Sequence, residues 1–134
     1  MIRCIRLITT EGLSHVEQGW IDLATDERGR VTTDSLPVTA ARFQTTAPGS
    51  SLDWHVAPAR QLVITLRGTL AFVTRDGERF ALEPGEVLLA EDTTGSGHEW
   101  SIEGDDPWDR LYVVLADGVE VPFRRADGEG VAAG

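Results

Sequence analysis

Three polar side chains, His55, Gln61 and His98, are of types that bind metal ions or move protons. Side chains alternate along a β-strand, so His55 and position 57 face the same side, and Gln61 can rejoin that face after a turn at Pro58. Two neutral imidazoles and one amide oxygen are an acceptable set of metal ligands with an open coordination position. Without a metal, two imidazoles can donate and accept protons near neutral pH. These residues therefore predict a site for metal-assisted or acid–base chemistry.

The segment around His55 and Gln61 has a recognisable spacing. It runs from Gly49 through His55, Ala57 and Gln61 to Gly68. The intervals resemble those of the first signature of the cupin family, Gly-x5-His-x-His-x3-4-Glu-x6-Gly. Ala57 stands in place of the second histidine of that signature, and Gln61 stands in place of its glutamate.

The segment from Pro84 to His98 resembles the second cupin signature, Gly-x5-Pro-x-Gly-x2-His. Glu91 occupies the usual proline position, and the loop before His98 is longer than the common form. The resemblance is to small single-domain bacterial cupins with an RmlC-like jelly roll. It implies an all-β fold, namely a cupin-type double-stranded β-helix (jelly-roll barrel) with N-terminal strands. It also implies that His55, Gln61 and His98 face one cavity.

The resemblance implies a divalent metal ion (Fe, Mn, Zn, Ni or Cu) held by His55, Gln61 and His98, although the motif is degenerate. Ala57 removes one imidazole ligand and Gln61 is a neutral donor, so metal affinity should be lowered. A replacement carboxylate could come from one of three nearby acidic residues, Asp53, Glu91 or Asp92.

Three functional hypotheses remain open for this cavity. In the first, a small-molecule-transforming enzyme of the lyase, isomerase or cyclase type uses His55, His98 and Gln61 as catalytic residues, with acid–base or metal-assisted chemistry. In the second, the protein binds a small molecule without transforming it. The third, a metal-dependent dioxygenase, suffers most from the missing ligand. No serine or cysteine nucleophile with an adjacent base is recognisable.

Short apolar runs separated by Gly, Pro and Asp predict an antiparallel all-β domain without a long helix. We expect one cupin domain over residues 1–123 with a barrel core at about 38–116, a surface loop from Thr25 to Ser35, and a flexible tail at 124–134. The pair Asp76-Gly77 predicts a type I′ hairpin turn. Strands are expected near Ile2 to Thr9, His15 to Leu23, Val38 to Thr46, Leu52 to Val56, Leu62 to Leu66, Thr69 to Arg75, Arg79 to Leu82, Glu86 to Ala90, His98 to Glu103 and Arg110 to Leu115.

Several other side chains have less specific roles. Trp54 and Trp100 are expected to point away from the signature histidines, toward the outer core or a dimer interface. Arg60 and Arg67 could bind a substrate carboxylate, but solvated strand-edge positions are the preferred interpretation. His15 is expected at the surface or on an edge strand, with the barrel mouth as the alternative.

The composition and net charge of the chain limit the classes of partner that it can bind. A chain of 134 residues can bury one core, and its 12 basic and 22 acidic residues give a net charge of −10, which opposes contact with nucleic acid and anionic lipid. The lone Cys4 excludes an intramolecular disulfide, and no stretch resembles a membrane span or a leader peptide. We therefore expect a cytoplasmic protein that takes a small-molecule substrate or ligand. Strands such as Leu62 to Leu66 are apolar on both faces and need two covers, which predicts a homodimer.

Overall fold

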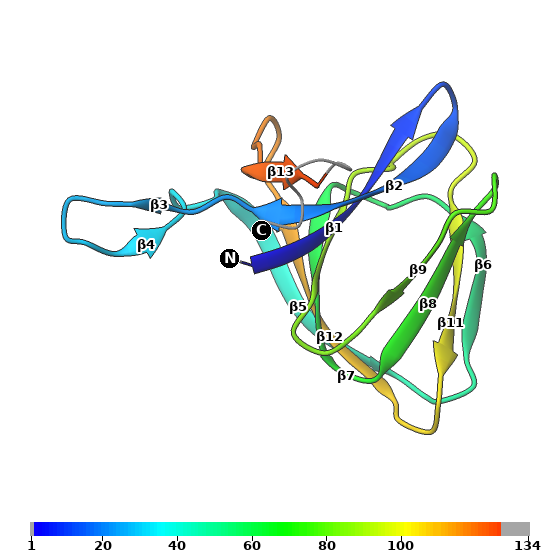
Figure 1. The fold of residues 1–134 in the computed structure, drawn as a ribbon. Coiled ribbons are helices and arrows are strands. Elements are labelled where there is room, and N and C mark those ends of the chain that lie inside the picture. The colour runs from blue at the N-terminus through cyan, green and yellow to red at the C-terminus, as the bar shows by residue number, and fades with distance from the viewer. Residues whose placement is uncertain (1, 127–134) are drawn as a thin grey trace.

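The computed structural model of the chain describes residues 2–126, which form strands, turns and loops but no helix. The expected all-β class is confirmed (Figure 1). The strands are β1 (Ile2–Thr10), β2 (Leu13–Ile21), β3 (Ala24–Thr25), β4 (Val31–Thr32), β5 (Val38–Thr46), β6 (Ser51–His55), β7 (Gln61–Arg67), β8 (Thr69–Thr74), β9 (Arg79–Leu82), β10 (Val87–Ala90), β11 (His98–Glu103), β12 (Trp108–Leu115) and β13 (Phe123–Arg125). Within the described range, no helix is long and apolar enough to cross a membrane.

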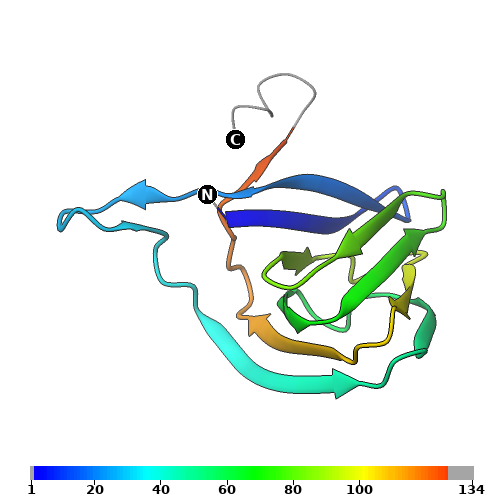
Figure 2. The same cartoon turned by 60° about the horizontal axis from the view of Figure 1, so that its bottom comes forward.

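Two sheets form the body of the molecule. The larger has the strand order β13-β2-β1-β10-β7-β12-β5, and the smaller has the order β6-β11-β8-β9. All described pairs are antiparallel except β1 with β10. The two sheets curve around a shared interior (Figures 1 and 2), as expected for a jelly roll.

The main core lies between the sheets because alternate side chains of each strand point inward. In β8, Leu70, Phe72 and Thr74 are buried while their neighbours are partly exposed. The larger sheet supplies Val63, Leu88 and other apolar side chains to the same cluster. A polar side chain on this inner face needs a hydrogen-bond partner, and the Thr74 hydroxyl accepts from the Glu78 amide.

The turn predictions need one correction. Asp76-Gly77 does not form a type I′ turn, because Gly77 has a positive φ of 88° and Asp76 does not. The Gly77 amide donates to the Thr74 carbonyl at 3.0 Å, so the connection is a longer loop closed by a left-handed glycine. The type I′ pattern occurs instead between β1 and β2, where Glu11 and Gly12 have φ of 52° and 79°.

Two segments expected to be irregular contain paired strands. The predicted surface loop from Thr25 to Ser35 holds part of the β3–β4 hairpin, which projects away from the two sheets in both views (Figures 1 and 2). Arg124 and Arg125, assigned to the tail from the sequence, belong to β13 and pair with Trp20 and Gly19 of β2. The rest of the expected tail, from residue 127 onward, lies outside the described residues.

Residues 2–126 cover only one half of the outer face of the larger sheet. Cys4, Leu89 and Leu115 are buried there beneath apolar residues of the chain that leads to β13. In the other half, the registers place Phe43, Leu111 and Ile64 in one row across β5, β12 and β7. Phe43 is 77% exposed and Leu66 is 53% exposed. The N-terminal strand extends this sheet in its plane and leaves that half uncovered.

We propose that a second copy of the chain covers this half-face, since a two-fold contact sets the same apolar row against itself. The chain is expected to run as a dimer in size-exclusion chromatography with light scattering, and Phe43→Asp is expected to shift it to the monomer mass. Val31→Asp is the matched control, because Val31 is 65% exposed on the separate β3–β4 hairpin. A wild-type chain that remains monomeric at high concentration would contradict the proposal.

Candidate functional site

His55, Gln61 and His98 line one cavity of about 380 Å³ between the two sheets. His55 ends β6 and lies directly opposite His98, the first residue of β11, in the smaller sheet. Their ring centroids are 4.5 Å apart with an interplanar angle of 60°. Gln61 begins β7 in the larger sheet, where it pairs with Ala90 and is 5% exposed. The cavity therefore has an imidazole pair on one wall and an amide on the other.

Gly97 allows the two histidine-bearing strands to approach each other this closely. It has a positive φ of 74°, and a β-carbon at this residue would lie 2.2 Å from the His55 carbonyl oxygen. Only glycine fits both the left-handed backbone and the contact. The polar loop before His98 thus ends in a residue that sets the distance between the two rings.

A buried carboxylate orients His98. Asp92 is fully buried, and its Oδ2 lies 2.6 Å from Nδ1 of His98. Ser14 of β2 donates to the same oxygen at 2.7 Å. The contact with this carboxylate engages Nδ1 of the ring and directs Nε2 away from Asp92. No side chain or backbone group of residues 2–126 bonds to that Nε2.

His55 is held in a comparable way. Its Nδ1 lies 2.7 Å from the backbone carbonyl of Asp53, which fixes the hydrogen on Nδ1 and again leaves Nε2 without a partner in the described part of the chain. Burial lowers the pKa of His55 below its ordinary value, and the nearby His98 acts in the same direction, whereas the bond to Asp53 opposes it. At neutral pH this ring is therefore mostly uncharged and able to accept a proton.

Aromatic side chains form much of the remaining wall. Trp100 lines the cavity and meets Trp108 edge-on at a centroid distance of 5.2 Å. The expectation that Trp100 points away from the histidines is wrong, because it lies two residues after His98 and shares its face. Trp54 lies outside the cavity lining, and the guanidinium of Arg75 is 4.0 Å from its ring centroid.

The three carboxylates considered as replacement metal ligands do not reach the cavity. The Asp53 side chain accepts a bond from the Trp54 amide. Glu91 binds Arg6 and Arg60 on the other side of the sheet. Asp92 is engaged behind His98. Neither Arg60 nor Arg67 lines the cavity, since Arg60 pairs with Glu91 and Arg67 pairs with Asp106. The alternative that they bind a substrate there is therefore not supported.

The donor set does not fit a firmly held divalent cation. The cavity offers two imidazoles and one neutral amide, and Ala57, 4% exposed, fills the position of the missing histidine. Among the described residues, no acidic side chain lines the cavity, whereas Arg42 and Arg110 do. Positive charge without a compensating carboxylate disfavours a divalent ion.

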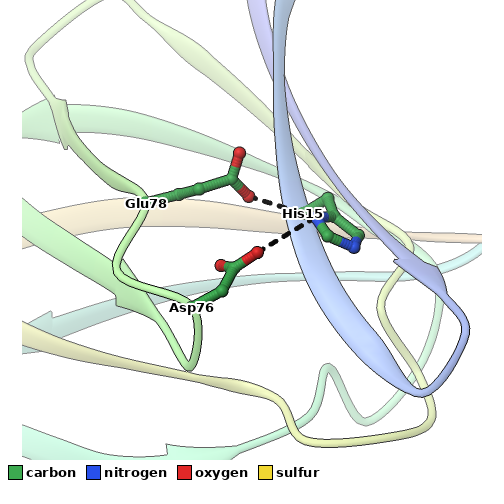
Figure 3. Close-up of side chains that lie close together, drawn as sticks. All are labelled: His15, Asp76 and Glu78. Carbon is green, nitrogen blue, oxygen red and sulfur yellow. Dashed lines mark ion pairs between the residues drawn. The ribbon is translucent and has the colours of Figure 1, made fainter.

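A second cluster of potential metal ligands lies outside the cavity. Figure 3 shows His15 of β2 directed toward Asp76 and Glu78 on the loop between β8 and β9. Nδ1 of His15 lies 3.5 Å and 3.3 Å from their carboxylate oxygens, and Glu78 also accepts a bond from the Val16 amide. All three side chains are about one-third exposed. These bonds fasten the N-terminal hairpin to the smaller sheet.

Three residues that line the cavity were not predicted from the sequence: Arg42, Arg110 and Tyr112. Asp92 was considered only as a replacement metal ligand, and its contact with His98 was not predicted. A signal existed for Arg110, because it shares the strand parity of Trp108 and Tyr112 and therefore faces inward with them. Asp92 had no such signal, since it approaches His98 through a loop rather than through a strand register.

Two curved sheets around a small cavity, with His55 and His98 on paired neighbouring strands of the smaller sheet, define a jelly-roll barrel. The family model described as the cupin domain matches residues 42–114, more than half of the chain. The protein therefore belongs to the cupin family, as the two sequence signatures indicated. No curated protein sequence gives a match.

Solved structures with similar folds are distant in sequence. A protein containing a cupin-2 domain from Shewanella frigidimarina is 20% identical, with a TM-score of 0.42 over 62% of this chain and 81% of that one. A conserved protein of unknown function from Streptococcus pyogenes is 16% identical, with a TM-score of 0.42 over 63% and 68%. NovW, a 4-keto-6-deoxy sugar epimerase from Streptomyces spheroides, is 17% identical, with a TM-score of 0.40 over 86% and 71%.

Proposed function

We propose that this cupin is an enzyme of the lyase, isomerase or cyclase type that moves protons on a small molecule held in its cavity. The observation that carries the proposal is the imidazole pair of His55 and His98. Each ring is anchored through Nδ1, and each leaves Nε2 without a partner among residues 2–126. Two such rings at 4.5 Å, in a cavity with largely apolar walls, suit proton removal and proton return on one substrate.

The proposed step begins at a carbon next to a carbonyl group. Nε2 of His98 removes the proton, and the electron pair of the C–H bond becomes the double bond of an enolate. The positive charge gained by the ring faces the Asp92 carboxylate. The amide of Gln61 donates a hydrogen bond to the enolate oxygen. Return of the proton to another position through His55 or His98 completes an isomerisation, and departure of a leaving group completes an elimination.

Solvent deuterium incorporation tests this proposal even though the natural substrate is unidentified. The protein in D₂O is incubated with a panel of enolisable compounds that pairs 2-oxo and 3-oxo acids with neutral ketones of the same size. We expect exchange at the carbon next to the carbonyl, measured by NMR and mass spectrometry, to exceed exchange in buffer with free imidazole. Compounds that bind but undergo neither exchange nor elimination would instead favour the non-catalytic binding cupin.

Metal content separates this function from the dioxygenase hypothesis. Protein purified without a chelator is expected to contain far less than one divalent ion per chain, and added EDTA should leave the exchange rate unchanged. Elemental analysis of the wild type, His98→Ala and His15→Ala provides the comparison. Stoichiometric metal that disappears with His98→Ala would contradict the metal-free mechanism. Metal that disappears only with His15→Ala would belong to the surface cluster and leave the mechanism intact.

A further inference from the structure

The cavity contains a buried positive charge that no acidic residue of the described chain neutralises. Arg110 of β12 is 2% exposed, and within residues 2–126 no carboxylate forms an ion pair with it. A guanidinium stays charged at every pH at which the protein is folded. Burying an unpaired charge is costly, so the site is arranged to receive a negative charge from elsewhere.

The hydrogen bonds of Arg110 hold its position and leave one end free. Nε donates to the Tyr112 hydroxyl at 3.2 Å, and Nη1 donates to the Thr46 hydroxyl at 2.7 Å and the Trp108 carbonyl at 3.1 Å. The two N–H groups of Nη2 have no partner in the described chain. Tyr112 accepts from Nε, so its own hydroxyl hydrogen is also available. Two donors of this kind match the paired oxygens of a carboxylate.

Aromatic stacking makes this arrangement rigid. The Arg110 guanidinium lies 3.8 Å from the Trp108 ring centroid and 5.3 Å from that of Tyr112. Arg42 of β5 lies 4.4 Å from the Tyr112 ring centroid and lines the same cavity. The chain carries a net charge of −10, but the two arginines give this cavity a local positive charge.

The other walls indicate what the anion is attached to. They carry apolar side chains from both sheets together with Trp100, and the volume of about 380 Å³ suits a small organic molecule. Acidic side chains do not line the cavity in the described part of the chain, so a second cation on the ligand would find no partner. The fitting ligand is therefore a small organic acid with an apolar body and no ammonium group.

We propose that Arg110, assisted by Tyr112 and Arg42, binds the carboxylate of a small organic acid whose apolar body fills the barrel cavity. That the reactive carbon of this acid points toward His55 and His98 rests on the proposed function. The binding of its carboxylate by Arg110 is independent of that function. The substrate class is then an enolisable carboxylic acid, such as a 2-oxo or 3-oxo acid with an apolar substituent.

Phenylacetate and phenylacetamide form a matched probe pair, because they differ in charge but hardly in shape. In ligand-observed NMR titrations, phenylacetate is expected to bind at least about tenfold more tightly than phenylacetamide, as a charge-assisted bond implies. Tyr112→Phe removes one donor and keeps the ring, so it should weaken phenylacetate binding several-fold. Arg110→Met should abolish the preference, whereas Arg67→Met, which alters an exposed arginine outside the cavity, should preserve it.

The outcomes separate this inference from the proposed function. Equal affinity of the wild type for the two probes would overturn the carboxylate site, whatever the exchange experiments show. Circular dichroism shows whether Arg110→Met folds. If it does not fold, the affinities of the wild type for the two probes and the effect of Tyr112→Phe still test the carboxylate site. His98→Asn should retain phenylacetate binding. Wild-type protein that binds phenylacetate but catalyses no exchange on any oxo acid would leave the carboxylate site standing and overturn the proton-transfer function.

Discussion

Replacing His98 with asparagine is expected to lower the rate of protein-catalysed deuterium exchange by about 10² to 10⁴-fold, the usual contribution of a general base. The asparagine amide can still donate to Asp92, so the buried carboxylate keeps a partner. The substitution removes Nε2, the nitrogen proposed to take the proton. Folding should be largely preserved, and the loss should appear in kcat more than in KM.

His15→Asn is the matched control for this experiment. It makes the same chemical change in a histidine that lies against Asp76 and Glu78 outside the cavity (Figure 3). Its exchange rate should equal that of the wild type. Asp92→Asn gives a companion measurement, because it keeps the shape of the partner of His98 and removes the charge. If His98→Asn exchanges as fast as the wild type, the base has been assigned to the wrong ring.

Gly97→Ala is expected to destabilise the fold by about 3 kcal/mol or more, since a left-handed alanine is strained and the added carbon collides with backbone. That carbon would lie 2.2 Å from the carbonyl oxygen and 2.5 Å from the carbonyl carbon of His55. Neither partner is the end of a flexible side chain, so β6 and β11 must move apart. In thermal unfolding, the melting temperature should fall by roughly 10 °C.

Gly104→Ala separates the two causes of this loss. Gly104 has a nearly equal φ of 76°, but a β-carbon there meets nothing within 4 Å. Only the backbone strain applies, so a loss of about 1 kcal/mol is expected. Equal losses of stability for the two variants would show that the contact between residue 97 and His55 adds no steric cost. A Gly97→Ala protein that remains folded should also lose exchange activity, whereas Gly104→Ala should not.

The sequence predicted the strands well because each inner face repeats every second residue. The segment from Leu62 to Leu66 illustrates this, since Val63 and Thr65 are buried and Leu66 is exposed, as alternation requires. Turn type was harder to predict. Asp-Gly favours a type I′ turn locally, but at this hairpin Thr74 bonds both Asp76 and the Glu78 amide and stabilises a longer loop. A local preference of this kind yields readily to side-chain hydrogen bonds.

The shared cavity of His55, Gln61 and His98 could be predicted from motif spacing and strand alternation, whereas the contact of Asp92 with His98 could not. His55 and His98 face each other because β6 and β11 pair, and each lies within a motif with fixed intervals. Asp92 meets His98 only because the chain between them turns back on itself, and no periodicity encodes that path. Arg110 was missed for another reason. A charged residue in a strand is by default expected to face solvent, whereas the parity of Arg110 with Trp108 places it inside.

The hydrogen bond from Ser14 to Asp92 makes the orientation of His98 depend on a segment outside the barrel core. Ser14 lies in the N-terminal hairpin, outside the residues 42–114 that match the family model. The same hairpin accepts the Glu91 amide at the Leu7 carbonyl and the Ser96 amide at the Gly12 carbonyl. The barrel thus supplies the imidazoles, while an accessory segment supports the loop that orients one of them. Changes in that accessory segment can therefore alter the orientation of His98, and with it the proposed proton transfer, while every residue of the barrel stays the same.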